Sequence, residues 1–167
     1  ALTEFVKATP RSLTALDISC NLLTSPGDEE SAVVDLLACA LAPSSSLTAL
    51  AVGGNALGDE SGALIASMLP AATKLTSLDI RSDGYSSACA RQIAEVVLAS
   101  STLAWFGGVP LRELRELRDG NESNLDLAGC CLGPAEAYVL GQLVLAPSPL
   151  AYCNVDGDEL LTLAELR

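Results

Sequence analysis

The sequence predicts an α/β fold: a curved solenoid in which parallel strands line the inside and helices the outside. The prediction rests on three stretches that share one apolar spacing and one polar turn position, L-x-x-L-x-[IV]-x-x-[ND]-x-apolar. These are SLTALDISCNLL (12–23), SLTALAVGGNAL (46–57) and KLTSLDIRSDGY (74–85). Their leading leucines, at positions 13, 47 and 75, lie 34 and 28 residues apart. Such a recurring period indicates a stack of similar units.

The apolar spacing inside each stretch predicts a short strand. Alternate residues of a strand point to opposite sides, so Leu16 and Ile18 face inward in the first copy while the residues between them face outward. The polar residue at the ninth position, Asn21, Asn55 or Asp83, can bind backbone groups where the chain turns out of the strand. A stretch with one apolar stripe follows each strand and predicts a helix that returns the chain.

This pattern resembles the leucine-rich repeat, in its ribonuclease-inhibitor-like form of about 28 residues per unit. The resemblance covers nearly the whole chain, so residues 1–167 are expected to form a single domain. Its repeats are expected to start near residues 13, 47, 75, 103, 122 and 150. The resemblance implies a segment of a horseshoe whose concave strand face binds other molecules.

The fourth unit departs from the pattern. An irregular insert over residues 107–123, GGVPLRELRELRDGNES, stands where a turn and a long helix are expected. Within it, LRELREL places Arg112 four residues before Glu116, which predicts a short surface helix. The insert and the following L-D-L and L-G-P motifs are similar to those of leucine-rich repeat proteins of unicellular algae and protists. That likeness makes the plastid a candidate location.

Composition restricts the function. The formal net charge of −12 argues against nucleic-acid binding, which needs clustered Lys and Arg, and favours protein partners with a neutral or basic surface. The chain has no histidine, which excludes Ser-His-Asp and Cys-His catalysis and His-ligated metals, so we expect no enzyme and no cofactor. No apolar run is long enough for a membrane span. The six cysteines are expected to be reduced, which favours an intracellular, reducing compartment.

The end of the chain offers a different interpretation. In NVDGDELLTLAE (154–165), the positions 1, 3, 5 and 12 of an EF-hand calcium loop are occupied by Asn154, Asp156, Asp158 and Glu165. However, the sixth position, where the loop needs glycine for a sharp turn, is Glu159. The same stretch also matches one more copy of the leucine spacing. A calcium-regulated module is therefore an alternative, and a further repeat is the preferred interpretation.

Outward residues of the strands form the candidate binding site on the concave face. The set is acidic and contains two aromatic residues that suit interface anchors: Asp17, Ser19, Asp79, Arg81, Trp105, Asp126, Tyr152, Asn154 and Asp156. The competing interpretation is that these are solvated strand residues without a partner.

Neither end of the sequence carries a polar terminal unit, so we expect further chain or a partner there. The preferred function is a non-enzymatic protein-interaction scaffold that uses the concave face and the open ends of the solenoid. The alternative is a structural or linker subunit, bound peripherally in a larger assembly such as an algal photosynthetic membrane complex.

Overall fold

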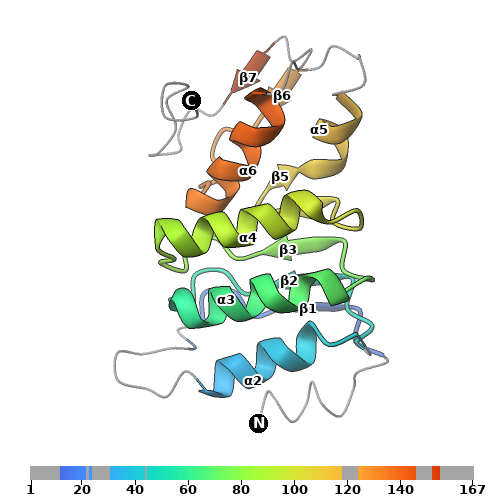
Figure 1. The fold of residues 1–167 in the computed structure, drawn as a ribbon, viewed down its shortest axis with the longest axis vertical. Coiled ribbons are helices and arrows are strands. Elements are labelled where there is room, and N and C mark those ends of the chain that lie inside the picture. Colours follow the sequence, from blue (N-terminus) through green and yellow to red (C-terminus); the bar gives the residue numbers. More distant parts are fainter. Residues whose placement is uncertain are drawn as a thin grey trace.

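The computed structural model describes residues 12–21, 23, 31–43, 45–117, 124–145 and 152–154. Within these residues, short strands alternate with helices, and Figure 1 shows the elements stacked along the long axis of the molecule with the helices on one side of the strands. The strands form two sheets, one ordered β1-β2-β3-β4-β5 and the other made of β6 and β7. The predicted α/β solenoid of strand–helix units is confirmed.

The first sheet is built on one inward leucine per strand. Its strands are β1 (Ala15–Asp17), β2 (Ala49–Ala51), β3 (Ser77–Asp79), β4 (Trp105–Phe106) and β5 (Val109–Pro110). The first four are parallel and in one register, in which Leu16, Leu50, Leu78 and Phe106 lie side by side. The last three of these side chains are almost fully buried, and Leu16 in the edge strand is half-buried.

The helices form a continuous second layer. They are α2 (Ser31–Ala40), α3 (Gly58–Met68), α4 (Ser87–Ala99) and α6 (Pro134–Leu145), with the short 3₁₀-helix η1 (Leu69–Ala71) after α3. Each packs on the next, α2 on α3, α3 on α4 and α4 on α6, as Figure 1 shows. Their inward residues Leu37, Ile65, Ile93 and Leu140 are fully buried. Among the helices that the structure describes, none combines the length and hydropathy needed to cross a bilayer.

Asn55 joins neighbouring units through its amide. The side chain is fully buried, and its Nδ2 donates to the carbonyl oxygens of Ile18 at 2.9 Å and Val52 at 2.6 Å. Its Oδ1 accepts from the backbone N–H of Asn21 at 2.8 Å and of Leu23 at 3.3 Å. The predicted use of the ninth-position residue, to satisfy backbone groups in the turn, is confirmed here.

Asp83 takes the same position one unit further on. Its Oδ1 accepts from the backbone N–H of Asn55 at 2.7 Å, and the N–H groups of Ala56 and Leu57 also interact with the carboxylate. Burial raises the pKa of Asp83 to about 6, against the lowering effect of these donors. The ninth positions therefore form a ladder that links the first three units.

The insert begins as a β-hairpin. β4 and β5 pair antiparallel, with Trp105 opposite Pro110 and Phe106 opposite Val109. The two residues between them, Gly107 and Gly108, have φ of 52° and 86°, the conformation of a tight two-residue hairpin turn. The predicted parallel arrangement is present in β1 to β4, and β5, within the irregular insert, runs antiparallel because a turn with two positive φ angles reverses the chain.

Helix α5 (Leu111–Leu117) follows the hairpin and lies beside α6 in Figure 1. The predicted short helix is confirmed, and the predicted pair is formed, with Arg112 Nε 3.0 Å from Glu116 Oε1. The helix is not confined to the surface, however. Leu111 and Leu114 on its other side are buried, so α5 belongs to the hydrophobic core.

The second sheet lies beyond the insert. β6 (Asn124–Asp126) and β7 (Tyr152–Asn154) pair in parallel, with Asp126 opposite Asn154. The hairpin and α5 thus separate the two sheets along the chain, while α6 packs directly on α4. The strand layer is interrupted where the helix layer is continuous.

Candidate functional site

The acidic residues predicted for the concave face have a structural task at the ends of their strands. Each carboxylate accepts a hydrogen bond from the backbone N–H two residues further on: Asp17 from Ser19 at 3.0 Å, Asp79 from Arg81 at 3.1 Å and Asp126 from Ala128 at 3.0 Å. Such bonds shape the turn by which the chain leaves a strand. These aspartates therefore stabilise the repeat whether or not a partner binds.

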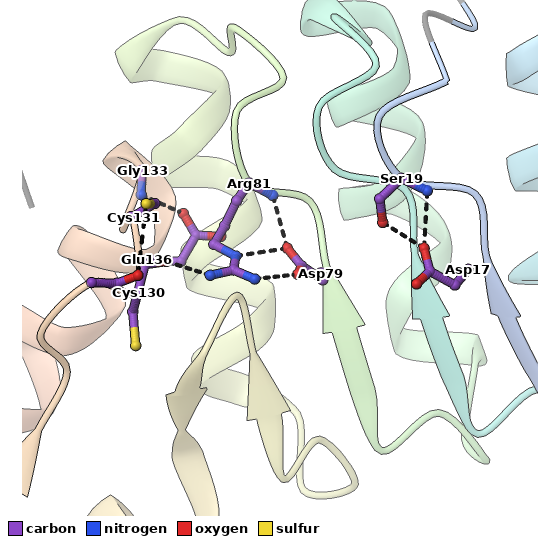
Figure 2. Close-up of polar contacts among 9 residues, drawn as sticks. Asp17, Ser19, Asp79, Arg81, Cys130, Cys131, Gly133 and Glu136 are labelled. Carbon is purple, nitrogen blue, oxygen red and sulfur yellow. Dashed lines mark hydrogen bonds and ion pairs between the residues drawn. The ribbon is translucent and has the colours of Figure 1, made fainter.

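Asp17 and Ser19 form an exposed pair at the end of β1. Ser19 Oγ donates to Asp17 Oδ1 at 2.6 Å, next to the backbone bond, as Figure 2 shows. The side-chain and backbone hydrogen bonds from Ser19 lower the pKa of Asp17. Asp17 is exposed, so it presents a negative charge to solvent at neutral pH.

Asp79 and Arg81 form a two-pronged ion pair at the end of β3. Arg81 Nε donates to Asp79 Oδ1 at 3.0 Å, and Nη2 lies 2.6 Å from Oδ2. Burial by itself would raise the pKa of Asp79, but the hydrogen bonds and charge of Arg81 outweigh it and leave that pKa below its usual value. Arg81 Nη1 also donates to the carbonyl oxygen of Cys130 (Figure 2). Arg81 therefore joins β3 to the loop after β6, across the insert.

Glu136 lies buried beside this joint, in the first turn of α6. Its Oε2 accepts from the backbone N–H of Gly133 at 3.1 Å, and its Oε1 has no hydrogen-bond partner among the described residues. A methyl group on Gly107, at the tip of the hairpin, would collide with the Glu136 carboxyl. Burial raises the pKa of Glu136 to about 7; the charge of Asp79 adds to this effect and that of Arg81 opposes it. The site holds a carboxyl group that is partly protonated at neutral pH.

Trp105 is the exposed aromatic residue of the sheet. It is 48% exposed, the only large apolar side chain of the described residues with such exposure. It borders a hollow of about 340 Å³, here called the Trp105 groove, which is lined by Ala104, Trp105, Pro110, Arg112, Glu113 and Glu116. A second hollow of about 380 Å³ adjoins it and shares Ala104, Arg112 and Glu116. The insert therefore builds a recess beside the strand face.

The charged residues of this recess differ in whether their side chains already form hydrogen bonds or ion pairs within the chain. Arg115 donates inward, from Nη1 to the carbonyl oxygen of Leu103 at 2.8 Å and from Nη2 to that of Val97 at 3.1 Å. Arg112 is paired with Glu116. Glu113 is exposed, and within the described residues no hydrogen bond or ion pair is found for it.

The predicted site residues are distributed over both sheets. Asp79 and Arg81 are in contact, and the charge of Asp17 influences Asp79 from two strands away. Trp105 is the neighbour of Ser77 on the next strand, and Asp126 lies on the second sheet. Tyr152 and Asn154 belong to β7, but their side chains lie outside the described part of the structure. The use of these residues as a binding site stays a prediction.

Asp156 and nearly all of the proposed calcium loop lie outside the described residues. Within the residues that are described, no group of Cys, Asp or Glu side chains is arranged to hold a metal ion. Among the cysteines whose side chains the structure describes, five form no disulfide: Cys20, Cys39, Cys89, Cys130 and Cys131.

Comparison with known proteins supports the repeat. A family sequence model described as "Leucine Rich repeat" matches residues 9–27 and 44–66. These segments contain β1 and β2 together with Asn21 and Asn55, the ninth-position residues of their units. The chain contains leucine-rich repeats in these segments. Its likeness to algal and protist members stays a prediction.

A solved structure, "Leiomodin-1 Actin-Binding Site 2 (ABS2)", is similar in fold to this leucine-rich repeat protein. The TM-score is 0.58, and the alignment covers 95% of this chain and 79% of that chain at 16% sequence identity. At this identity the likeness concerns the fold alone. A search of curated protein sequences finds no match.

Two features of the insert and of the helix after it were not predicted, although the sequence carries signals for them. Gly107-Gly108 between apolar residues is typical of a two-residue hairpin. In the sequence Gly133-Pro134-Ala135-Glu136, proline opens a helix and glutamate three residues after the glycine can bind its N–H. The burial of Glu136 had no such signal, because it depends on Gly107 of the preceding unit.

Proposed function

We propose that this leucine-rich repeat protein is a non-enzymatic protein-interaction scaffold that binds its partner through the concave strand face, with Trp105 as the apolar anchor. The observation that carries the proposal is the exposure of Trp105, 48%, at the edge of a groove. Tryptophan is among the residues most enriched in the centres of protein interfaces. A large apolar side chain that borders a recess is a natural place for a partner to bind.

The strand face beside Trp105 supports this proposal. In the shared register of the sheet, Trp105 on β4 lies in one row with Ala15 on β1, Ala49 on β2 and Ser77 on β3. These small side chains leave room for a partner segment that crosses the strands. Trp105, the large exposed side chain, lies at the end of the row. The row can therefore guide a partner segment toward the anchor.

Charge indicates the kind of partner. Asp17 is exposed at the start of the face, whereas Asp79 is neutralised by Arg81. Together with the net charge of −12, this favours a neutral or basic contact surface on the partner. Leiomodin-1 ABS2 is named as an actin-binding site. A protein-binding role for a similar fold supports the class of function proposed here, and it leaves the partner's identity to experiment.

Crosslinking with mass spectrometry on the full chain tests the proposal. We expect crosslinks from the partner to the neighbourhood of Trp105, and Trp105→Ala should weaken binding of that partner by about tenfold or more. Glu95→Ala, on the exposed side of α4, is the matched control and should bind as the unchanged chain does. Binding that is insensitive to Trp105→Ala but lost in Glu95→Ala would place the site on the helix layer.

The other functions considered draw no support from the described residues. A structural linker subunit of a photosynthetic membrane complex would need a contact that no described residue indicates. A calcium-regulated module would depend on residues 154–165, most of which lie outside the described part.

A further inference from the structure

We propose that the Trp105 groove recognises an arginine side chain of the partner, with the guanidinium group stacked on the Trp105 indole and paired with the Glu113 carboxylate. The proposal rests on the proposed function and specifies the chemistry of the contact. It follows from the shape of the groove, from the distribution of charge in it, and from the geometry of the guanidinium group.

The shape of the groove suits one long side chain. Its volume of about 340 Å³ lies at the lower end of the range for small-molecule sites. Ala104 and Pro110 contribute apolar atoms, and the backbone of Trp105 pairs with Pro110 on one side and Ser77 on the other. The groove therefore offers an aromatic wall beside an apolar base, which fits the methylene stem of a long side chain.

The distribution of charge selects a cation. The nearby arginines already make contacts within the chain: Arg81 with Asp79 and Cys130, Arg115 with two backbone carbonyls, and Arg112 with Glu116. Glu113 is exposed and has no such contact among the described residues. An anionic group in the groove would face this carboxylate, and a purely apolar group would remove it from water without compensation. A cationic group would be attracted to it.

The geometry of the two acceptors favours arginine over lysine. A guanidinium group is planar, so it can stack on an indole and direct its N–H groups sideways to a carboxylate at the same time. An ammonium group is more strongly hydrated and lacks the planar fork. Trp105 and Glu113 line one groove, which allows both contacts to a single side chain.

Trp105 provides the measurement, because it is the only tryptophan in the chain. The full chain is titrated at low salt with the peptide acetyl-Gly-Arg-Gly-amide while tryptophan emission is recorded. Matched peptides carry citrulline, which has the same shape without the charge, or lysine. We expect saturable binding of the arginine peptide with a Kd on the order of 10 mM, a weaker response to lysine and none to citrulline.

The variant Glu113→Gln should weaken arginine-peptide binding by about fivefold, and Glu95→Gln on α4 should leave it unchanged. Circular dichroism on both variants checks that the fold is retained. Equal responses to arginine and citrulline, tighter binding of lysine than of arginine, or an unchanged Kd in Glu113→Gln would each overturn the inference. So would the absence of any peptide response.

The proposed function can be judged separately. If no peptide binds but Trp105→Ala still abolishes binding of the protein partner, the arginine contact is wrong and the scaffold proposal stands. If the partner binds Trp105→Ala normally, the concave-face proposal itself is wrong.

Discussion

The regular units that contain β1 to β3 and the insert that follows them are joined to their neighbours by different kinds of contact. In the regular units, each strand meets an equivalent strand in register, and Asn55 and Asp83 bind the turns of neighbouring units. At the insert, a reversed strand ends the first sheet, and Arg81 reaches across to the carbonyl oxygen of Cys130. Repetition makes equivalent contacts possible, whereas a break in the repeat requires contacts between residues that have no equivalent.

The two buried carboxyl groups, Asp83 and Glu136, show the difference most clearly. Asp83 belongs to the regular units and receives several backbone N–H groups. Glu136 belongs to the joint, where one oxygen accepts from Gly133 and the other has no partner among the described residues. Burial raises the pKa of both groups. The free energy of unfolding therefore depends on pH through both groups, and more strongly through Glu136.

The largest effect is expected when the ladder of the regular units is broken. Asn55→Ala removes four hydrogen bonds and leaves four backbone groups without this side-chain partner: the carbonyl oxygens of Ile18 and Val52 and the N–H groups of Asn21 and Leu23. We expect the free energy of unfolding to fall by about 4 kcal/mol, measured by urea denaturation.

Asn21→Ala is the control for this variant. Asn21 occupies the ninth position of the first unit, but it is exposed, and its side chain makes one hydrogen bond, to the carbonyl oxygen of Ser19. Its loss should cost about 1 kcal/mol or less. Equal losses in the two variants would contradict the view that the ladder depends on buried amides.

At the joint, Glu136→Gln should stabilise the protein above neutral pH. The folded-state pKa of Glu136, about 7, is above its ordinary value of 4.5, so the folded state binds the proton more tightly than the unfolded state. Stability is therefore lost as pH rises from about 4.5 to about 7 and stays lost above that. The shift corresponds to at most about 3 kcal/mol at pH 8, which the neutral amide should recover.

Urea denaturation between pH 4 and pH 8 measures this effect. The unchanged protein should become less stable across the interval, and Glu136→Gln should show a shallower decline. A decline of the same size in the variant would mean that Glu136 is not the group responsible.

A smaller effect of the same sign is expected from Asp83→Asn. The folded-state pKa of Asp83, about 6, exceeds its ordinary value of 3.8, so stability is lost as pH rises between these values. Asparagine is also the residue found at this ninth position in the preceding unit, where it is Asn55. We expect a gain of about 2 kcal/mol at pH 8, less than the full pKa difference implies, because the amide offers the backbone donors one acceptor oxygen in place of two. Destabilisation at pH 8 would indicate that the N–H donors need a full carboxylate.

The smallest effect is expected on the surface of α5. Arg112 and Glu116 form an ion pair one helical turn apart, and their side chains are 77% and 64% exposed. Glu116→Gln should lower the free energy of unfolding by about 0.3 kcal/mol, less in high salt. A loss above about 1 kcal/mol in urea denaturation would show that the pair holds the insert in place.

The fold of the repeated units follows from local patterns in the amino-acid sequence. The spacing of Leu47, Leu50 and Val52, copied in the units before and after, is a local signal for a strand that must bury one side. The role of the ninth-position asparagine in binding backbone groups could also be predicted, because the regular units pack against units with the same pattern. Exposure of Trp105 followed from the same alternation.

The contacts at the insert, in contrast, could not be read from the sequence, because they join residues that are distant along the chain. Arg81 and Cys130 are 49 residues apart, and neither occupies a position whose partner the repeat predicts. Glu136 is buried because Gly107, in the preceding unit, leaves space for its carboxyl. The Trp105 groove arises because β5 reverses the chain and places α5 beside β4. Such contacts join segments with different sequences, so the periodic pattern of the repeats does not predict them.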